Sequence, residues 1–327
     1  DITKPSAGNG NASTPTAESA PFKMTLKNLE IKNGYIVYDD ASSGVMTVLD
    51  GFNYTMSGDF SSDNFTMEND MTIAQFTMTF GDLTCLRNVN TKLKASIEAD
   101  MANMKFTFKK AEIGLNELGL GINGFFAMPE AGYDMDIKFN AKQTEFKNIL
   151  SLVPTAYTKD FSSVKTSGKL TLNGFAKGIM TDKAMPAFAV NVKIDDAMFH
   201  YPSLPKSVND ITVDIHIDNK TGNPDNTVID VKKFHLEMAE NPVDAVMHIE
   251  TPVSDPNISG TILGKVDLAS LKDVLPLDKN DNLNGKITAD VTMKGRMSSI
   301  EKGKYEEFDA KGQIIVMDMD YKSKDNP

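Results

Sequence analysis

The segment Thr91–Met101, TKLKASIEADM, carries the pattern that decides the fold of this chain. Its apolar residues are Leu93, Ala95, Ile97, Ala99 and Met101, and they alternate with Lys92, Lys94, Ser96, Glu98 and Asp100. Because successive side chains of a β-strand point to opposite faces, this alternation predicts a strand with one apolar and one polar face.

The same alternation recurs along most of the chain. It is found in Phe65–Ile73, Phe76–Phe80, Phe188–Ile194, Ile211–Ile217, Val243–Ile249 and Ile287–Met293. Turns are predicted at Asn33-Gly34, Ser57-Gly58-Asp59, Asn173-Gly174, Gly222-Asn223-Pro224 and Asn284-Gly285. This close spacing of strands leaves no room for crossover helices and predicts an antiparallel meander.

Only two segments have the spacing of a helix, and both are short. They are Glu145–Leu152 and Ser270–Leu275, each followed by a proline (Pro154 and Pro276) that ends a helix. We therefore predict a mainly β protein: an elongated, curved antiparallel sheet built from repeated strand, short-helix and hairpin units, with an apolar concave face and two short helices.

The repeat is visible in four pairs of residues. Two glycines recur after 117 residues and two aromatic residues after 120, and the pairs are Gly168/Gly285, Gly178/Gly295, Phe188/Phe308 and Tyr201/Tyr321. LEIKNGYIVYDD near the start of the chain resembles the last strand of the repeat, with Tyr38 in the place of Tyr201. The predicted divisions are a flexible linker over 1–21, an N-terminal antiparallel β region over 22–140, a first repeat unit over 141–262 and a truncated second unit over 263–327. We expect the natural protein to continue on both sides of these residues.

Composition argues against several functions. The 327 residues contain 34 Lys and Arg against 45 Asp and Glu, which gives a net charge of −11 and argues against a nucleic-acid partner. A single cysteine, Cys85, excludes an internal disulfide. The chain shows no motif of a known catalytic site, so we predict no enzyme activity, no catalytic residues and no cofactor.

Three histidines are weak candidates for a metal site. His216, His235 and His248 lie on the polar sides of what look like successive strands. In one register their imidazoles could meet at a metal ion, but a slip of one residue separates them. We therefore predict no metal site and expect the three histidines on a solvated face.

The apolar sides of the strands must be covered. The sheet could pack on a second sheet, close into a barrel, or curl into a trough that holds an apolar ligand. The 19 methionines favour a trough slightly, because Met adapts to varied apolar partners, although Met also fills irregular cores. The candidate groove residues are Phe188, Val190, Val192, Ile194, Ile211, Val213, Ile215, Ile217, Ile287, Val291 and Met293.

Several segments together resemble the AsmA-like family of Gram-negative bacteria, in its Bacteroidetes form. They are LKNLEIKNGYIVYDD, SGKLTLNGFAKG, PAFAVNVKIDDAMFHYPSLPKSVNDITVDI and ASLKDVLPL, and the resemblance covers roughly residues 22–327. It implies a periplasmic β-structure with a hydrophobic groove, anchored in the inner membrane by an N-terminal helix that precedes this chain. It further implies a role in outer-membrane biogenesis and in phospholipid transport between the two membranes, with outer-membrane proteins as further partners.

The sequence therefore favours a non-enzymatic protein whose groove shields the acyl chains of phospholipids or other acyl lipids. The alternative is a structural or adhesive β-scaffold with a dry sandwich core and a protein-interaction role. A bound lipid separates the two hypotheses.

Overall fold

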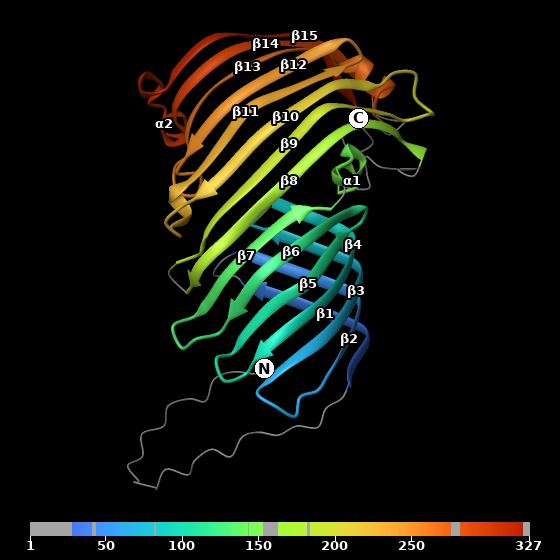
Figure 1. Cartoon of the computed structure of the whole chain (residues 1–327). Coiled ribbons are helices and arrows are strands. Elements are labelled where there is room, and N and C mark those ends of the chain that lie inside the picture. The colour runs from blue at the N-terminus through green and yellow to red at the C-terminus, as the bar shows by residue number, and fades with distance from the viewer. Residues whose placement is uncertain are drawn as a thin grey trace.

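The computed structural model describes residues 28–40, 44–81, 83–142, 144–152, 163–181, 184–275 and 282–322. These residues form one antiparallel sheet of 15 strands, in which each strand pairs with the strands before and after it in the sequence (Figure 1). The predicted linker over 1–21 lies outside the described residues. The mainly β, curved antiparallel sheet predicted from the alternation is confirmed.

The strands are long, and several exceed ten residues. They are β1 (Asn28–Asp40), β2 (Val45–Gly58), β3 (Asn64–Phe80), β4 (Leu83–Asp100), β5 (Lys105–Leu115), β6 (Leu118–Ala127), β7 (Tyr133–Ala141), β8 (Lys165–Met180), β9 (Ala187–His200), β10 (Val208–Asn219), β11 (Thr227–Met238), β12 (Asn241–Glu250), β13 (Asn257–Asp267), β14 (Asn282–Arg296) and β15 (Asp309–Lys322). The short helices are α1 (Phe146–Leu150), α2 (Met297–Glu301) and the 3-10 helices η2 (Pro224–Asn226), η3 (Leu268–Asp273) and η4 (Tyr305–Glu307).

Both predicted helices are present, and η3 shows how such a short element is held. The Asp267 carboxylate accepts a hydrogen bond of 3.1 Å from the backbone N–H of Ala269. This N–H group belongs to the first turn and has no acceptor within the helix. Helices α2 and η4 were not predicted from the sequence.

Three of the predicted turns are wrong, because they lie inside strands. Asn33-Gly34 falls within β1, where Asn33 has a φ of 49° at an irregularity in the pairing with β2. Asn173-Gly174 falls within β8 and Asn284-Gly285 within β14. These residues form bulges, or allow a neighbouring backbone to approach closely, in a strand that continues through them. They do not reverse the chain.

The glycines of the repeat occupy matching places in the sheet. Gly168 on β8 has a φ of 107° and Gly285 on β14 a φ of 117°, and each lies where the pairing with the next strand shifts register. Opposite them, Asp196 and Asp318 both have a φ of 49°. Strands β14 and β15 therefore repeat the local geometry of β8 and β9.

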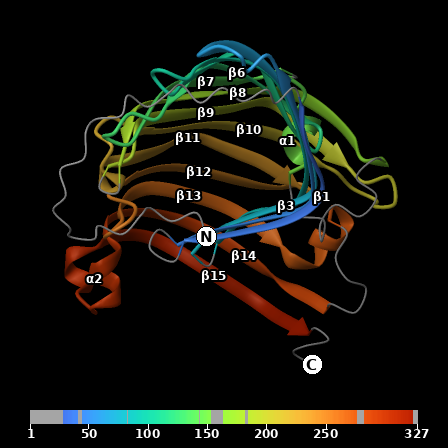
Figure 2. The same ribbon diagram turned by 90° about the horizontal axis from the view of Figure 1, so that it is seen from below.

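A buried cluster lies where α1 and the residues after η3 pack against the sheet. Phe146 of α1 and Val274 after η3 join Leu118, Leu170 and Ile194 in this cluster. Because a helix of five residues is unstable alone, this apolar packing is what holds α1 in place. Figure 2 shows α1 inside the arch that the strands trace, so the face it contacts is the inner face.

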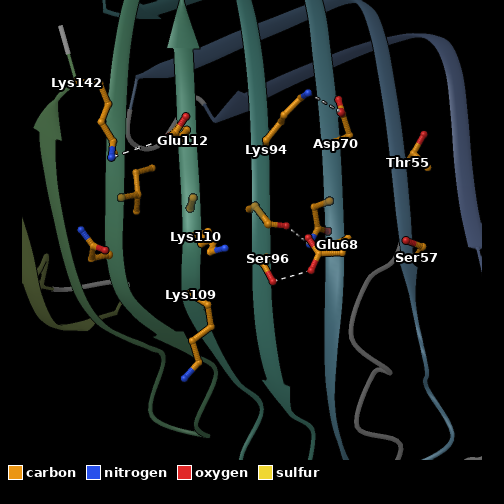
Figure 3. A pocket seen from close by; sticks show the side chains of 16 residues that line it. Thr55, Ser57, Glu68, Asp70, Lys94, Ser96, Lys109, Lys110, Glu112 and Lys142 are labelled. Carbon is orange, nitrogen blue, oxygen red and sulfur yellow. Dashed lines mark hydrogen bonds and ion pairs between the residues drawn. The ribbon is translucent and has the colours of Figure 1, made fainter.

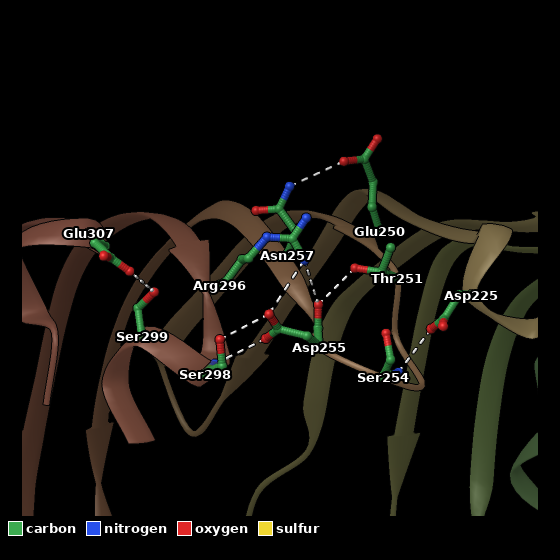
Figure 4. A network of polar contacts seen from close by, with 10 residues as sticks. All are labelled: Asp225, Glu250, Thr251, Ser254, Asp255, Asn257, Arg296, Ser298, Ser299 and Glu307. Carbon is green, nitrogen blue, oxygen red and sulfur yellow. Dashed lines mark hydrogen bonds and ion pairs between the residues drawn. The ribbon is translucent and has the colours of Figure 1, made fainter. Parts of the chain in front are cut away.

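Polar contacts fix the loops at one rim of the sheet (Figure 4). The Asp255 carboxylate accepts hydrogen bonds from the backbone N–H of Ser298 at 3.0 Å and from its hydroxyl at 2.9 Å. The Arg296 guanidinium lies 3.4 Å from the same carboxylate. The loop between β12 and β13 is thereby joined to the start of α2.

Candidate functional site

The inner face of the sheet is mainly apolar from β2 to β15. Directly opposed residues of paired strands carry their side chains on the same face, so the register defines which residues share it. One row across β2–β7 consists of Tyr54, Met71, Leu93, Ile113, Leu120 and Ala141. A second row across β8–β15 consists of Leu172, Val192, Ile215, Val231, Met247, Gly260, Met293 and Ala310. We call this surface the apolar face.

No charged side chain lies on the apolar face between β2 and β14 in the described residues. Its polar side chains are neutral and hydrogen-bonded where they are buried. Asn69, for example, accepts a hydrogen bond of 2.6 Å from the Tyr54 hydroxyl and donates one of 3.3 Å to the carbonyl of Ala95. At about 4.8 Å per strand, 15 strands extend this face over roughly 65–70 Å.

The structure brings all 11 predicted groove residues onto the apolar face. Ile217 lies opposite Val190, Ile215 opposite Val192 and Val213 opposite Ile194. Phe188 lies further along β9, and Ile287, Val291 and Met293 occupy the same face of β14. The predicted residues on β9 and β10 and those on β14 are therefore connected along one face by β11, β12 and β13.

The face is packed in one region and open in others. Ile194, Ile211 and Val213 are buried in the cluster with α1, whereas the other eight predicted residues are partly exposed. Within the described residues we find no second sheet on this face, so the two packed sheets of the scaffold hypothesis are not the architecture observed. A ligand therefore has access to the face only outside the α1 cluster.

Most members of the face on the N-terminal strands are not among the predicted groove residues. Phe108, Ile122, Ile137 and Phe139 lie on it, on β5, β6 and β7. The signal that could have found them is the same alternation. Bulges such as the register shift between Phe108 and Ala111 interrupt it, because they place two successive lysines on the outer face.

The three histidines lie on the outer face, each beside a polar partner. His216 Nδ1 lies 2.6 Å from the Asn191 side-chain oxygen, and His235 Nδ1 lies 2.7 Å from Asp244. His216 and His248 both face Asp230, one from each side, so two strand spacings, about 10 Å, separate their backbones. In the described part of the chain no group of three or more His, Cys, Asp or Glu side chains is arranged to hold a metal ion.

A shallow polar cavity of about 540 Å³ lies on the outer face of β2–β6 (Figure 3). Two of its lysines form ion pairs with carboxylates that line the same cavity: Lys94 lies 3.8 Å from Asp70, and Lys142 lies 3.5 Å from Glu112. These side chains are about half exposed or more. Such pairs contribute little to stability, and the cavity has the character of a solvated sheet surface.

No protein-family model matches the chain, and no curated protein or solved structure is significantly similar to it. None of the helices in the described ranges has the length and apolar character needed to span a membrane.

Proposed function

We propose that this protein shields the acyl chains of lipids on its apolar face and acts without catalysis. The observation that carries the proposal is a face free of charge from β2 to β14, with no second sheet on it in the described residues. An exposed apolar surface of this extent on a soluble β-protein is typical of a binding surface for an apolar partner.

The mechanism in this proposal is solvation. Each methylene of an acyl chain that leaves water for the apolar face contributes about 0.8 kcal/mol, so a chain needs no specific polar contact to bind. Phosphate headgroups would stay at the rims, where polar loops face water. Met71, Met247 and Met293 suit this task, because unbranched thioether side chains adapt to different chain positions.

The cellular part of the proposal is supported by the resemblance of residues 22–327 to the AsmA-like family. We propose a periplasmic protein, anchored to the inner membrane, that takes part in phospholipid transport between the inner and outer membranes. The strict strand-by-strand order of the sheet supports this role, because it extends one continuous apolar surface in a single direction.

The test uses a matched pair of substitutions on β13. Ile262 lies on the apolar face, outside the α1 cluster, and the adjacent Thr261 lies on the outer face between the uncharged residues Val246 and Thr292. Native mass spectrometry and lipid extraction are applied to the purified wild type, Ile262→Asp and Thr261→Asp. We expect lipid with the wild type and Thr261→Asp, and loss of most of it with Ile262→Asp, because a carboxylate is costly to bury against hydrocarbon.

A second pair on β12, Met247→Asp and Val246→Asp, repeats the comparison on another strand. Circular dichroism shows whether each variant keeps its sheet. A lipid-free wild type, or equal lipid recovery from both members of each pair, would contradict the proposal and favour a protein-interaction scaffold. Val213 is unsuitable for this test, because it is buried in the α1 cluster and a charge there would unfold the sheet.

A further inference from the structure

The apolar face on β8–β11 ends differently at its two rims. All four strands lie inside the sheet, with a paired strand on either side. At the rim where β9 and β11 end, the α1 cluster buries Ile194 and Val213, each 7% exposed. Toward the opposite rim, where β9 and β11 begin, the residues of this face are partly exposed. They are Ala176, Phe188, Val190, Ile217 and Ile229, and we call them the open strip.

The two ends of the open strip also differ in polarity. Beyond the strip, the next opposed pair on β10 and β11 is Asn219 and Thr227, and the Asn219 side chain donates a hydrogen bond of 3.0 Å to the Thr227 hydroxyl. The Asn219 side-chain oxygen accepts hydrogen bonds from the backbone N–H groups of Thr221 and Gly222 in the loop between the two strands. The strip therefore leads from a polar loop at the rim to the apolar α1 cluster, an order that matches the two ends of an amphiphile.

The distance from the rim to the α1 cluster is close to the length of a membrane acyl chain. The residue steps along β9 from Phe188 to Ile194 span about 20 Å at about 3.3 Å per residue. The acyl chains of one leaflet fill half of a hydrocarbon core of about 30 Å, which is about 15 Å. A chain that starts at the rim therefore reaches the edge of the α1 cluster, where Leu172, Val192 and Ile215 pack against it.

We propose that acyl chains lie along β8–β11, with the headgroup at the rim of the loop 220–226 and the terminal methyl group against the α1 cluster, so that the cluster limits the length of chain that binds. This inference rests on the proposed function and specifies the orientation and the chain length of its ligand. A chain that ran across the strands would place its headgroup over the apolar face, where a polar group loses water without gaining a partner.

A series of fatty acids tests the length limit. Decanoate, palmitate and lignocerate compete with a fluorescent fatty acid for binding to the full chain. Because each buried methylene contributes about fourfold in affinity, palmitate should bind at least a hundredfold more tightly than decanoate. Lignocerate should bind within threefold of palmitate. A further rise of more than threefold from palmitate to lignocerate would overturn the length limit and leave the proposed function standing, since a chain laid across the strands meets no such stop. Failure of all three to bind would contradict the proposed function itself.

A matched pair of tryptophan variants tests where the limit lies. Val192 lies on the apolar face at the edge of the α1 cluster, and Thr171 lies on the outer face of the neighbouring strand β8. Val192→Trp should weaken palmitate binding at least tenfold and decanoate binding less than threefold, because the larger side chain fills only the space of the last methylenes. Thr171→Trp should change neither. Ile215→Phe, a smaller change opposite Val192, repeats the comparison if circular dichroism shows that Val192→Trp loses its sheet. Equal weakening of both fatty acids would overturn the proposal.

Photo-crosslinking tests the orientation of the chain. Two palmitate analogues carry a diazirine, one next to the carboxylate and the other next to the terminal methyl group, and mass spectrometry identifies the labelled residues of the wild type. We expect the first probe to label Phe188 and the loop 220–226, and the second to label Val192 and Ile215. The reverse order, or the same labelled residues from both probes, would overturn the proposal.

Discussion

The imidazole Nδ1 of His248 on β12 lies 2.6 Å from the Asp230 carboxylate on the neighbouring strand β11. Glu250 lies 3.6 Å from the other ring nitrogen. The hydrogen bond to Asp230 is the main cause that raises the pKa of His248 above its usual value, and Glu250 adds to it. This pair is a titratable link between two strands on the outer face.

The first prediction concerns this link. Because the pKa of His248 is raised in the folded state, its contribution to stability is complete below the unfolded-state pKa of about 6.5 and is lost as pH rises through the folded-state pKa. Asp230→Asn should lower the His248 pKa in an NMR titration of the imidazole. In urea unfolding it should cost more stability at mildly acidic than at alkaline pH. A loss that is equal at both pH values would contradict this explanation.

A second prediction concerns Gly168 in the bulge of β8. A Cβ at this position would lie 2.4 Å from both Cα and Cβ of Ala197, and its φ of 107° is unfavourable for other residues. Gly168→Ala should therefore destabilise the protein by more than the roughly 1–2 kcal/mol that a left-handed backbone costs alone. The control is Gly81→Ala, since Gly81 also has a positive φ but no atom within 4 Å of the added Cβ. Similar unfolding midpoints for the two variants would argue against the close contact.

The third prediction concerns the docking of α1. Phe146 is 6% exposed within the buried cluster, so Phe146→Ala should lower the free energy of unfolding by about 3–5 kcal/mol. Phe175 lies on the outer face of β8 with 38% of its surface exposed, and Phe175→Ala should change stability by only about 0.5 kcal/mol. Chemical denaturation of both variants measures the difference, and equal effects would show that α1 is not held by this side chain.

A fourth prediction concerns Asp255 at the rim. The Ser298 backbone N–H is the main cause that lowers the pKa of Asp255, with the Ser298 hydroxyl and Arg296 adding to it. The contribution of the ionised Asp255 carboxylate to stability is present above the unfolded-state pKa of about 3.9 and is lost as pH falls through the folded-state pKa. Asp255→Ala should speed amide hydrogen exchange in α2 at neutral pH. Glu250→Gln, which changes the exposed contacts with Asn257 and His248 but none with α2, should leave α2 unaffected. Unchanged exchange in Asp255→Ala would show that α2 is held by other contacts.

Alternation alone was sufficient to predict the architecture, because a period of two specifies both the strand and the face that each residue occupies. It was not sufficient to locate the turns. Asn and Gly adopt positive φ equally well in a hairpin and in a bulge, so Asn33-Gly34 and Asn284-Gly285 looked like chain reversals in the sequence.

The repeat illustrates a second limit. The glycines repeat after 117 residues, as predicted, but the strand that follows them is equivalent after 122 residues: Ile194 corresponds to Val316, and Asp196 to Asp318. Matching Phe188 with Phe308 is therefore two residues out of register. A slip of two residues preserves the alternation of a strand, so the sequence pattern does not detect it.

The sequence pattern predicted which residues share the candidate face, but not which of them are accessible. The 11 predicted residues share one face because the strands pair in sequence order. Which of them are covered depends on where α1 and η3 dock, and the burial of Ile194, Ile211 and Val213 follows from that tertiary contact. The distances between the three histidines could not be predicted, because they depend on the register of the strands.

The strict neighbour-to-neighbour order of the 15 strands also bears on how the molecule folds and changes length. Outside the cluster that α1 and the residues after η3 form with the sheet, each strand pairs only with the strands beside it. Cooperativity is therefore nearly one-dimensional there, and folding can start at a hairpin and spread in both directions. Insertion or deletion of a whole hairpin would leave the remaining ladders in register, so evolution or an engineer can lengthen or shorten such a molecule in steps of two strands.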